Sequence, residues 1–397
     1  MKILVLNCGS SSLKYQLIDM ADESVLAKGL CERIAIEGSR MEHKPAGKDK
    51  YIIERPMKDH SVAIQMVLEA LTDAEHGVLG SIGEVGAVGH RVVHGGEAFH
   101  SSVIITDEVM RAIKACCELA PLHNPPNLLG IEATEKLLPG VPMVAVFDTA
   151  FHQTMPEKAY LYAIPLKYYD EYKVRKYGFH GTSHKYVGLR AAEMLGKPAS
   201  ALKIITCHLG NGCSVAAING GKSVDTSMGF TPLEGLAMGT RSGDIDPSVV
   251  LFISERENMT AKDAAEILNK KSGVLGISGI SSDFRDLEAA RDQGDKNAAC
   301  ALSLFSYRTA KYIGAYAAAM NGADAIVFTA GVGENGPGTR SAVCAYLGYL
   351  GVALDEEKNA VRGREIDIAT PESKVRVLVI PTNEELVIAR DTNELVK

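Results

Sequence analysis

The chain has 397 residues, of which 46% are hydrophobic and 23% are charged. This composition excludes a disordered polypeptide and is sufficient for two or three folded domains. The formal net charge of −7 argues against a general nucleic-acid-binding protein. An anionic substrate would therefore have to be bound by local positive charge.

The cysteines indicate a protein of a reducing compartment, and the apolar segments indicate neither a secretory signal nor a membrane span. Eight cysteines occur without metal-ligand spacing, and Cys116 and Cys117 are adjacent rather than a CxxC motif. The first apolar run, residues 3–6, is too short for a secretory signal. The most apolar window, residues 312–332, is interrupted by polar residues and by glycine, so it does not predict a membrane span. We expect a cytoplasmic protein with no membrane or nucleic-acid partner.

The first 150 residues predict a sheet, then helices, then one more strand. Residues 3–6 and 13–18 are expected as strands on either side of a Gly/Ser turn, with further strands over 29–36, 50–55 and 86–93. Helical spacing predicts helices over 60–71, 106–119 and 127–138, with Thr106 as a cap and a break at 121–126. Residues 141–147 are a buried strand that ends at Asp148.

A change in composition near residue 150 predicts a domain boundary, and 151–174 is expected to be connecting structure. The predicted elements that follow are a helix to about 195, a strand at 203–207, a Gly/Asn-rich hairpin at 207–217, helices at 262–270 and 295–320, strands at 325–329 and 375–380, and a C-terminal helix. The same plan is thus expected twice, in α/β domains comprising 1–150 plus 384–397 and 151–383. Two such domains would place both Gly-rich hairpins at one cleft.

Two nucleotide-binding motifs nearly match. AAINGGKS at 216–223 ends like a P-loop, but Ala216 stands where that motif requires glycine. GVGENG at 331–336 is a literal GxGxxG after a strand, which leaves a nucleotide-dependent oxidoreductase as an alternative. A Rossmann fingerprint normally lies in a repeated βαβ unit, and the preceding elements do not supply one.

Eight short motifs occur in one order along nearly the whole chain: NCGSSSLK (7–14), GHRVVHGG (89–96), FDTAFH (147–152), YGFHGTSH (177–184), HLGNGCS (208–214), GTRSGDIDP (239–247), AGVGENG (330–336) and PTNEE (381–385). With these motifs the chain resembles the acetokinase family, within the sugar-kinase/Hsp70/actin superfamily. The resemblance implies two duplicated ribonuclease H-like (actin-like ATPase) domains with a cleft between them. It also implies in-line transfer of the ATP γ-phosphoryl group to acetate, giving acetyl phosphate and ADP, by a Mg²⁺-dependent homodimer in which Mn²⁺ can substitute.

The resemblance also implies which residues act on the phosphoryl group. Arg91, Arg241 and His180 would bind it and neutralise its charge, and Asp148 would be the catalytic acid/base. An acceptor carboxylate is already ionised at pH 7 and needs no base. Asp148 is therefore better suited physically to orienting an arginine or the waters of the metal.

The metal, nucleotide and acceptor sites follow from the same motifs. Asn7 and Glu384 would hold Mg²⁺, and Glu384 also suits a helix N-terminus. The nucleotide would contact Lys14, His208, Leu209, Gly210, Asn211, Gly212, Asp283, Phe284, Arg285, Gly331, Val332, Gly333, Glu334 and Asn335. The acceptor would contact Arg91, Val93, Leu122, His123, Phe179 and Pro232.

Each of these residues also has a plainer interpretation. A lone arginine is usually part of a surface ion pair, a lone histidine is usually structural, and apolar residues are usually core. Propionate is the acceptor that is hardest to exclude, because one methylene changes binding by only about 1–3 kcal/mol. An Hsp70- or actin-type ATPase without a small acceptor is the second class, and the two arginines and the histidine motifs argue against it.

Overall fold

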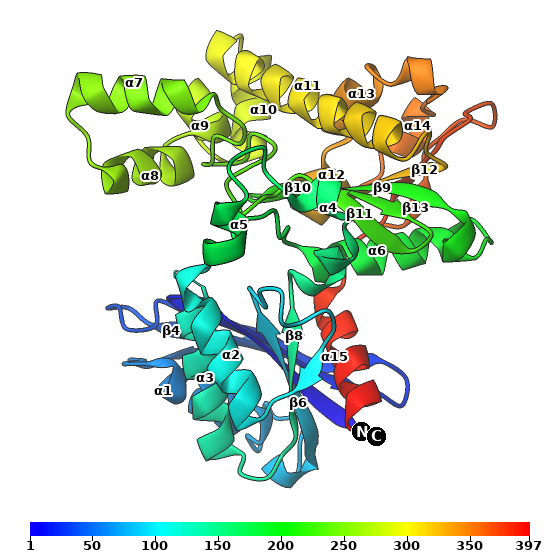
Figure 1. Ribbon diagram of the computed structural model, residues 1–397. Coiled ribbons are helices and arrows are strands. Elements are labelled where there is room, and N and C mark those ends of the chain that lie inside the picture. Colours follow the sequence, from blue (N-terminus) through cyan, green and yellow to red (C-terminus); the bar gives the residue numbers. More distant parts are fainter. Residues whose placement is uncertain (122) are drawn as a thin grey trace. The chain divides into compact units, whose positions relative to one another are not determined.

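The computed structural model describes residues 1–121 and 123–397, and the chain divides into two compact units (Figure 1). Unit 1 comprises Met1–Phe151 and Asn383–Lys397, and unit 2 comprises His152–Thr382. Each unit contains one β-sheet with helices packed on it. None of the helices within the described ranges is both long and apolar enough to cross a membrane.

Unit 1 is built on an eight-stranded sheet with the order β5-β4-β3-β2-β1-β6-β8-β7. Strands β1 to β5 pair as successive antiparallel neighbours, whereas β6 runs parallel to β1 and β8 runs parallel to β6. The elements are β1 Lys2–Cys8, β2 Ser12–Asp19, β3 Ser24–Glu32, β4 Arg40–Pro45, β5 Tyr51–Glu54, α1 His60–Leu71, β6 Val85–Val92, β7 Val103–Ile104, α2 Asp107–Ala115, α3 Asn124–Leu137, β8 Met143–Phe147 and α15 Glu384–Leu395.

Both faces of the unit 1 sheet are buried, because its central strands alternate between two apolar clusters. Leu4 and Leu6 of β1 point into the larger cluster, which includes residues of α1 and α3. Ile3 and Val5 point to the other face, where Ile388 of α15 covers them. The C-terminal helix is therefore an integral part of the N-terminal unit (Figure 1).

Unit 2 is built on a six-stranded sheet with the order β11-β10-β9-β12-β14-β13. Helix α11 packs over β9 and β10, and α6 packs against β9 and β12 (Figure 1). The elements are α4 Glu157–Tyr160, α5 Lys167–Tyr172, α6 Gly181–Met194, β9 Lys203–Leu209, β10 Cys213–Asn219, β11 Lys222–Thr226, α7 Pro247–Glu257, α8 Ala261–Lys270, α9 Gly273–Ser278, α10 Phe284–Asp292, α11 Lys296–Ala319, β12 Ala325–Thr329, α12 Ala330–Asn335, α13 Pro337–Cys344, α14 Glu356–Asn359, β13 Ile366–Asp367 and β14 Arg376–Val379.

The two sheets share one topology. The order β3-β2-β1-β6-β8 in unit 1 corresponds to β11-β10-β9-β12-β14 in unit 2. In each of these sets of five, the first three strands in chain order pair as antiparallel neighbours. The last two run parallel to the first strand. This is the arrangement of a ribonuclease H-like domain, so the predicted duplicated α/β fold is confirmed.

The structure corrects several of the expected elements. The expected break at 121–126 is wrong in part, because Pro125 and Pro126 lie in the first turn of α3, where a missing N–H costs nothing. Residues 151–174 contain the short helices α4 and α5 rather than only connecting chain. Residues 330–335 of the AGVGENG segment form the whole of the short helix α12. Strand β4 and helices α7, α9 and α10 were not predicted.

Candidate functional site

In unit 1, Arg91 and Asp148 meet at the carboxyl edge of the parallel strands. Arg91 is the penultimate residue of β6 and Asp148 directly follows β8, the parallel neighbour of β6. Arg91 Nε donates to Asp148 Oδ1 at 3.2 Å, and Arg91 Nη2 forms an ion pair with Oδ2. Burial acts to lower the pKa of the guanidinium, but the charge of Asp148 raises it overall. Asp148, only 1% exposed, thus keeps Arg91 charged and fixes its orientation.

Asn7 and Glu384 lie near this ion pair. Arg91 Nη1 donates to Oδ1 of Asn7, in β1, at 3.3 Å. Glu384 is the first residue of α15, and its half-buried carboxylate has no hydrogen bond or ion pair within the described residues. Burial, and then the nearby charge of Asp148, raise the pKa of Glu384 to about 7. A bound cation would relieve this unfavourable charge.

The oxygen donors at this edge fit a magnesium ion. Among residues 1–121 and 123–397, no group of three or more His, Cys, Asp or Glu side chains could hold a metal. Mg²⁺ keeps several of its waters and takes one or two carboxylates together with substrate phosphates. The carboxylate of Glu384 and the amide oxygen of Asn7 meet that requirement.

Two buried asparagines of α3 hold the backbone beside Arg91. Asn127 accepts from the Val93 N–H at 3.0 Å and donates to the Cys8 carbonyl at 2.7 Å. Asn124 accepts from the His94 N–H at 3.1 Å. These bonds link the segment after β6 to the end of β1. Neither asparagine was predicted, and the NPPN sequence itself was the signal, since prolines in the first turn mark the start of a helix.

In unit 2, a cluster of histidines and hydroxyl groups surrounds His180, the residue that precedes α6. The ring of His180 stacks on that of His208, with centroids 4.0 Å apart. Its Nδ1 lies 2.9 Å from Ser214 Oγ, which also lies 2.7 Å from His184 Nε2. Ser183 Oγ contacts His208 Nδ1 at 2.8 Å. The cluster joins α6 to the β9–β10 hairpin, and only its two stacked histidines were predicted as site residues.

Arg241 and His180 converge on Gly212. Arg241 lies in the loop at 227–246, between β11 and α7. Its Nη1 donates to the Pro232 carbonyl at 3.2 Å. A methyl group on Gly212 would lie 3.3 Å from that nitrogen and 3.5 Å from Cε1 and Nε2 of His180. Within the described residues no carboxylate pairs with Arg241, and burial lowers the pKa of its guanidinium.

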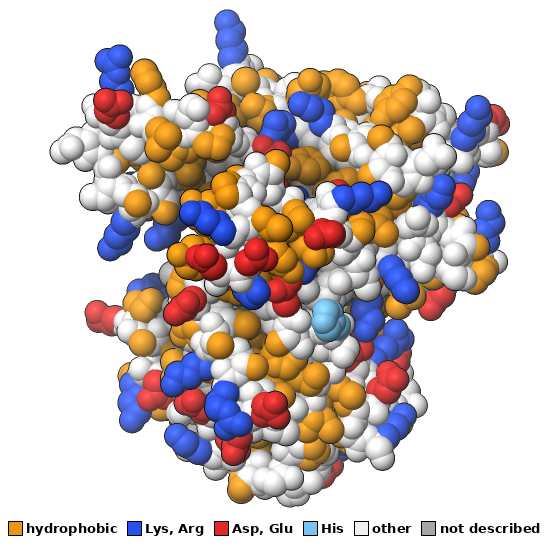
Figure 2. Space-filling view, in the orientation of Figure 1, with side chains coloured by type: hydrophobic (Ala, Val, Ile, Leu, Met, Phe, Trp, Pro, Cys, Tyr) orange, Lys and Arg blue, Asp and Glu red, His pale blue; other side chains and the backbone are white. Residues whose placement is uncertain are grey.

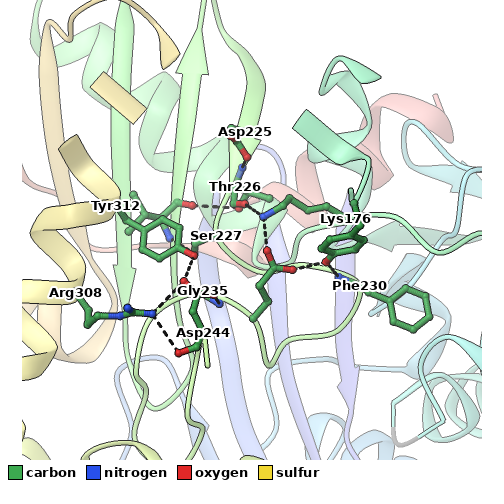
Figure 3. Close-up of polar contacts among 12 residues, drawn as sticks. Lys176, Asp225, Thr226, Ser227, Phe230, Gly235, Asp244, Arg308 and Tyr312 are labelled. Carbon is green, nitrogen blue, oxygen red and sulfur yellow. Dashed lines mark hydrogen bonds and ion pairs between the residues drawn. The ribbon is translucent and has the colours of Figure 1, made fainter. Parts of the chain in front are cut away.

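A network of polar contacts anchors the loop that carries this arginine (Figure 3). Lys176 Nζ donates to Glu234 at 2.8 Å on one side of the loop. On the other side, Asp244 accepts from the Tyr312 hydroxyl at 2.6 Å and pairs with Arg308 at 3.1 Å. Both partners of Asp244 belong to α11, the longest helix of the unit. The loop is therefore held by tertiary contacts rather than by regular structure.

A cavity of about 680 Å³ lies beside the β9–β10 hairpin in unit 2. Its wall includes the predicted residues Gly210, Asn211, Asp283, Phe284, Arg285, Gly331, Val332 and Asn335, and also Ser282, Glu288, Gly336 and Arg362, which were not predicted. The side-chain hydrogen bond from Arg285 lowers the pKa of Asp283 to about 2. A methyl group on Gly331 would meet nothing within 4 Å, so α12 is open at this point. The volume is in the usual range for a small-molecule site.

The other residues predicted to contact nucleotide are not part of this wall: Lys14, His208, Leu209, Gly212, Gly333 and Glu334. Lys14 belongs to unit 1, where it pairs across the hairpin with Asn7. Leu209 is buried in the core. Glu334 Oε1 accepts from the backbone N–H groups of Ala330 at 2.8 Å and Thr382 at 3.0 Å, so it fastens α12 in place.

The residues predicted to surround the acceptor are divided between the two units. Val93 is buried in unit 1, and His123 precedes α3 in the same unit. Leu122 lies outside the described residues. Phe179 is buried in unit 2, and Pro232 belongs to the loop that carries Arg241.

The sequence and the fold are similar to those of known proteins over their whole length. The family described as the acetokinase family matches residues 2–390. An acetate kinase of Desulfitobacterium hafniense (strain DSM 10664 / DCB-2) is 64% identical over 397 residues, which is 100% of both chains. The crystal structure of Porphyromonas gingivalis acetate kinase matches with a TM-score of 0.97 and 51% identity, covering 100% of both chains. A propionate kinase structure from Francisella tularensis subsp. tularensis SCHU S4 matches with a TM-score of 0.93 and 43% identity, covering 99% of both.

Proposed function

The chain belongs to the acetokinase family, and on that premise we propose that it transfers the γ-phosphoryl group of ATP to acetate, giving acetyl phosphate and ADP. The observation that carries this proposal is the convergence of Arg241 and His180 on Gly212. Gly210 and Asn211 of the same turn line the cavity in which the nucleotide would bind. Two hydrogen-bond donors, one of them a cation without a carboxylate partner among the described residues, thus adjoin a nucleotide-sized cavity.

The reaction requires charge neutralisation rather than proton transfer. An oxygen of the ionised acetate forms a bond to the γ-phosphorus, while the bond from that phosphorus to the β-phosphate oxygen breaks and ADP leaves with the electron pair. No proton moves, so we assign no base. Arg91, Arg241 and His180 bind the phosphoryl oxygens, and Asp148 holds Arg91 in place.

We assign Asn7 and Glu384 to the magnesium ion. When bound, Mg²⁺ neutralises phosphate charge. The support for this assignment is the donor chemistry at the edge of the unit 1 sheet and the Glu384 carboxylate, whose raised pKa reflects burial and the charge of Asp148.

A hydroxamate-trapping assay tests the reaction. With MgATP, the purified chain is expected to give acyl hydroxamate only when a short carboxylate is added, and kcat/KM is expected to fall from acetate to propionate to butyrate. ATP hydrolysis that does not depend on carboxylate, without hydroxamate, would favour an ATPase of the Hsp70 or actin type instead. Arg241→Ala is the variant to compare, since it should lower product formation by about 10²–10³-fold in the same assay.

Propionate is the second candidate acceptor. The solved propionate kinase that shares 43% identity with this chain supports it, since one fold serves both substrates. One methylene changes the free energy of binding by only about 1–3 kcal/mol, so the ratio of kcat/KM values decides between the two. A higher value for propionate would replace acetate as the assigned acceptor.

We further propose that the chain acts as a homodimer that uses α7 as a contact surface. The helix has no buried residue, and Leu251 and Phe252 are 71% and 57% exposed. Figure 2 shows hydrophobic side chains at the surface where Figure 1 labels α7. Exposed apolar side chains of this size favour burial against another protein surface. Light scattering after size exclusion should give twice the chain mass, and Phe252→Glu should reduce it to that of one chain. An unchanged dimer in Phe252→Glu would place the interface elsewhere.

We also assign the chain to the cytoplasm. All eight of its cysteines are free thiols, which suits a reducing compartment. Fractionation of cells that express the chain should recover its activity in the cytoplasmic fraction, and recovery from the membrane or periplasmic fraction would contradict this assignment.

A further inference from the structure

We propose that Thr206, His184 and Ser214 form an ordered chain of hydrogen bonds that keeps the neutral ring of His180 protonated on Nε2. In this order His180 is a hydrogen-bond donor toward an anion without first having to become an imidazolium ion. The three residues are positioning residues, because they act through His180. The consequence for catalysis rests on the proposed function, whereas the order of the protons does not.

The contacts form one continuous line through unit 2. Thr206 Oγ1, on β9, lies 2.7 Å from Nδ1 of His184, on α6. His184 Nε2 lies 2.7 Å from Ser214 Oγ, on β10, and Ser214 Oγ lies 2.9 Å from Nδ1 of His180. Thr206, His184 and Ser214 are all fully buried. Water is therefore excluded as a partner along these three links.

Counting protons leaves two possible orders. Each hydroxyl carries one proton, and a neutral imidazole carries one N–H and one acceptor nitrogen. Burial keeps the pKa of His184 well below its ordinary value, so this ring is neutral and cannot donate from both nitrogens. Ser214 can donate to only one of its two histidines and must accept from the other. The direction at one end of the chain thus fixes the direction at the other end.

The hydroxyl of Thr206 decides between the two orders. If His184 carried its proton on Nδ1, it would donate to Thr206, and the hydroxyl proton of Thr206 would then have no acceptor within residues 1–121 and 123–397. A buried donor without an acceptor is strongly disfavoured. In the opposite order Thr206 donates to His184 Nδ1, His184 Nε2–H donates to Ser214, and Ser214 donates to His180 Nδ1. Every buried proton then has an acceptor.

This order of protons decides whether Nε2 of His180 attracts or repels a phosphoryl oxygen. The ring edge of His180 that bears Nε2 faces the space above Gly212, which it shares with Nη1 of Arg241. A neutral ring with its proton on Nε2 presents an N–H there, whereas the other tautomer would present a lone pair. A lone pair would repel a phosphoryl oxygen. The chain of buried hydroxyls thus gives His180 the form in which it can stabilise negative charge.

Nuclear magnetic resonance of the full chain labelled with ¹⁵N-histidine tests the proton order directly. Long-range ¹H–¹⁵N correlation distinguishes the two tautomers, and comparison with His180→Asn identifies the signals of His180. We expect Nε2 to be protonated and Nδ1 to be unprotonated in the nucleotide-free protein at about pH 8, well above the ordinary histidine pKa. A His180 ring protonated on Nδ1 overturns the proposal.

Variants test whether the chain sets this order. Thr206→Val removes the terminal donor with little change of shape, and it should yield a mixture of His180 tautomers and a kcat lower by about fivefold or more, with each KM within about threefold. Thr206→Ser restores the hydroxyl and should restore both readouts. Ser223→Ala is the matched control, because it removes a buried hydroxyl that contacts a different ring, His152 Nδ1 at 2.7 Å. A wild-type spectrum in Thr206→Val overturns the proposal.

The two proposals fail separately. If carboxylate-dependent product were absent while His180 were protonated on Nε2, the assigned reaction would be wrong and the hydrogen-bond order would stand. If the reaction proceeded normally with the proton on Nδ1, the order would be wrong and the reaction would stand. The spectrum of the unmodified protein remains decisive even if a buried variant does not fold.

Discussion

Replacing Glu384 by Gln is expected to stabilise the metal-free protein above neutral pH. Burial and the charge of Asp148 raise the pKa of Glu384 from 4.5 to about 7 in the folded chain. Between these values the folded state binds more protons than the unfolded state, so the free energy of unfolding falls as pH rises. The full loss is present above about pH 7, and it is absent below about pH 4.5. Glutamine carries no charge and avoids this loss.

The size of the effect follows from the same two values. A rise from 4.5 to about 7, at about 1.4 kcal/mol for each pKa unit, corresponds to about 3 kcal/mol. The substitution also removes a negative charge from the first turn of α15, which costs about 0.3–1 kcal/mol. The net gain expected for Glu384→Gln at pH 8 is therefore about 2–3 kcal/mol.

Urea denaturation in the presence of a chelator measures this gain. The midpoint of Glu384→Gln should exceed that of the wild type at pH 8, and the difference should shrink to less than half at about pH 5.5. Glu385→Gln is the matched control, because it removes the other carboxylate of the same helical turn. This control should show no gain at pH 8.

Two results would refute the reasoning about Glu384. One is a Glu384→Gln midpoint at or below that of Glu385→Gln at pH 8, and the other is a gain of equal size at both pH values. The same variant should lose Mg²⁺-dependent turnover, since the carboxylate that destabilises the metal-free fold is the one assigned to the ion. Added Mg²⁺ should raise the midpoint of the wild type at pH 8 and leave that of Glu384→Gln unchanged.

Three further variants test other parts of the site. Arg241→Ala should lower kcat by about 10²–10³-fold with little change in the thermal midpoint, and normal turnover would remove this arginine from the mechanism. Gly331→Leu should raise KM for ATP by about tenfold or more, because its side chain would enter the cavity, while an unchanged KM would place the nucleotide elsewhere. Arg340→Met should lower the free energy of unfolding, measured by urea denaturation, by about 3 kcal/mol or more. The reason is that the fully buried guanidinium donates hydrogen bonds to Gly333, Glu334, Asn359 and Val361. A smaller loss would contradict the importance of these bonds.

Local sequence rules located those elements whose partners lie within the same unit. The long helix expected over 295–320 is α11, and Asp295 caps it by accepting from the Ala298 N–H at 2.8 Å. Thr106 caps α2 as expected, by accepting from the Val109 N–H at 3.3 Å. By contrast, α7 was missed because none of its residues is buried, so its sequence lacks the apolar period of a helix packed on a core.

The site was predictable where it depends on strand ends and not where it depends on tertiary contacts. Arg91 and Asp148 each stand at the end of an expected strand, and parallel pairing brings such ends together. Ser214 and Asn127 act through partners 30 or more residues away, and no local pattern distinguishes them from ordinary turn and cap residues. The loop of Arg241 could not be placed, since an ion pair and a hydrogen bond to α11 hold it.

The two units share one fold but differ in how their arginine side chains are paired with carboxylates. At the edge of the unit 1 sheet, the positive charge of Arg91 is already neutralised by Asp148, and Glu384 adds a further carboxylate. In unit 2, by contrast, Arg241 lies in a loop beside the β9–β10 hairpin and has no carboxylate partner in the described part of the chain, and its Nη1 lies close to Gly212 of that hairpin. Anion binding costs least where a cation is not already paired. We therefore propose the unit 2 hairpin as the primary phosphate site, while the unit 1 edge, with its excess of carboxylate, is better suited to a cation.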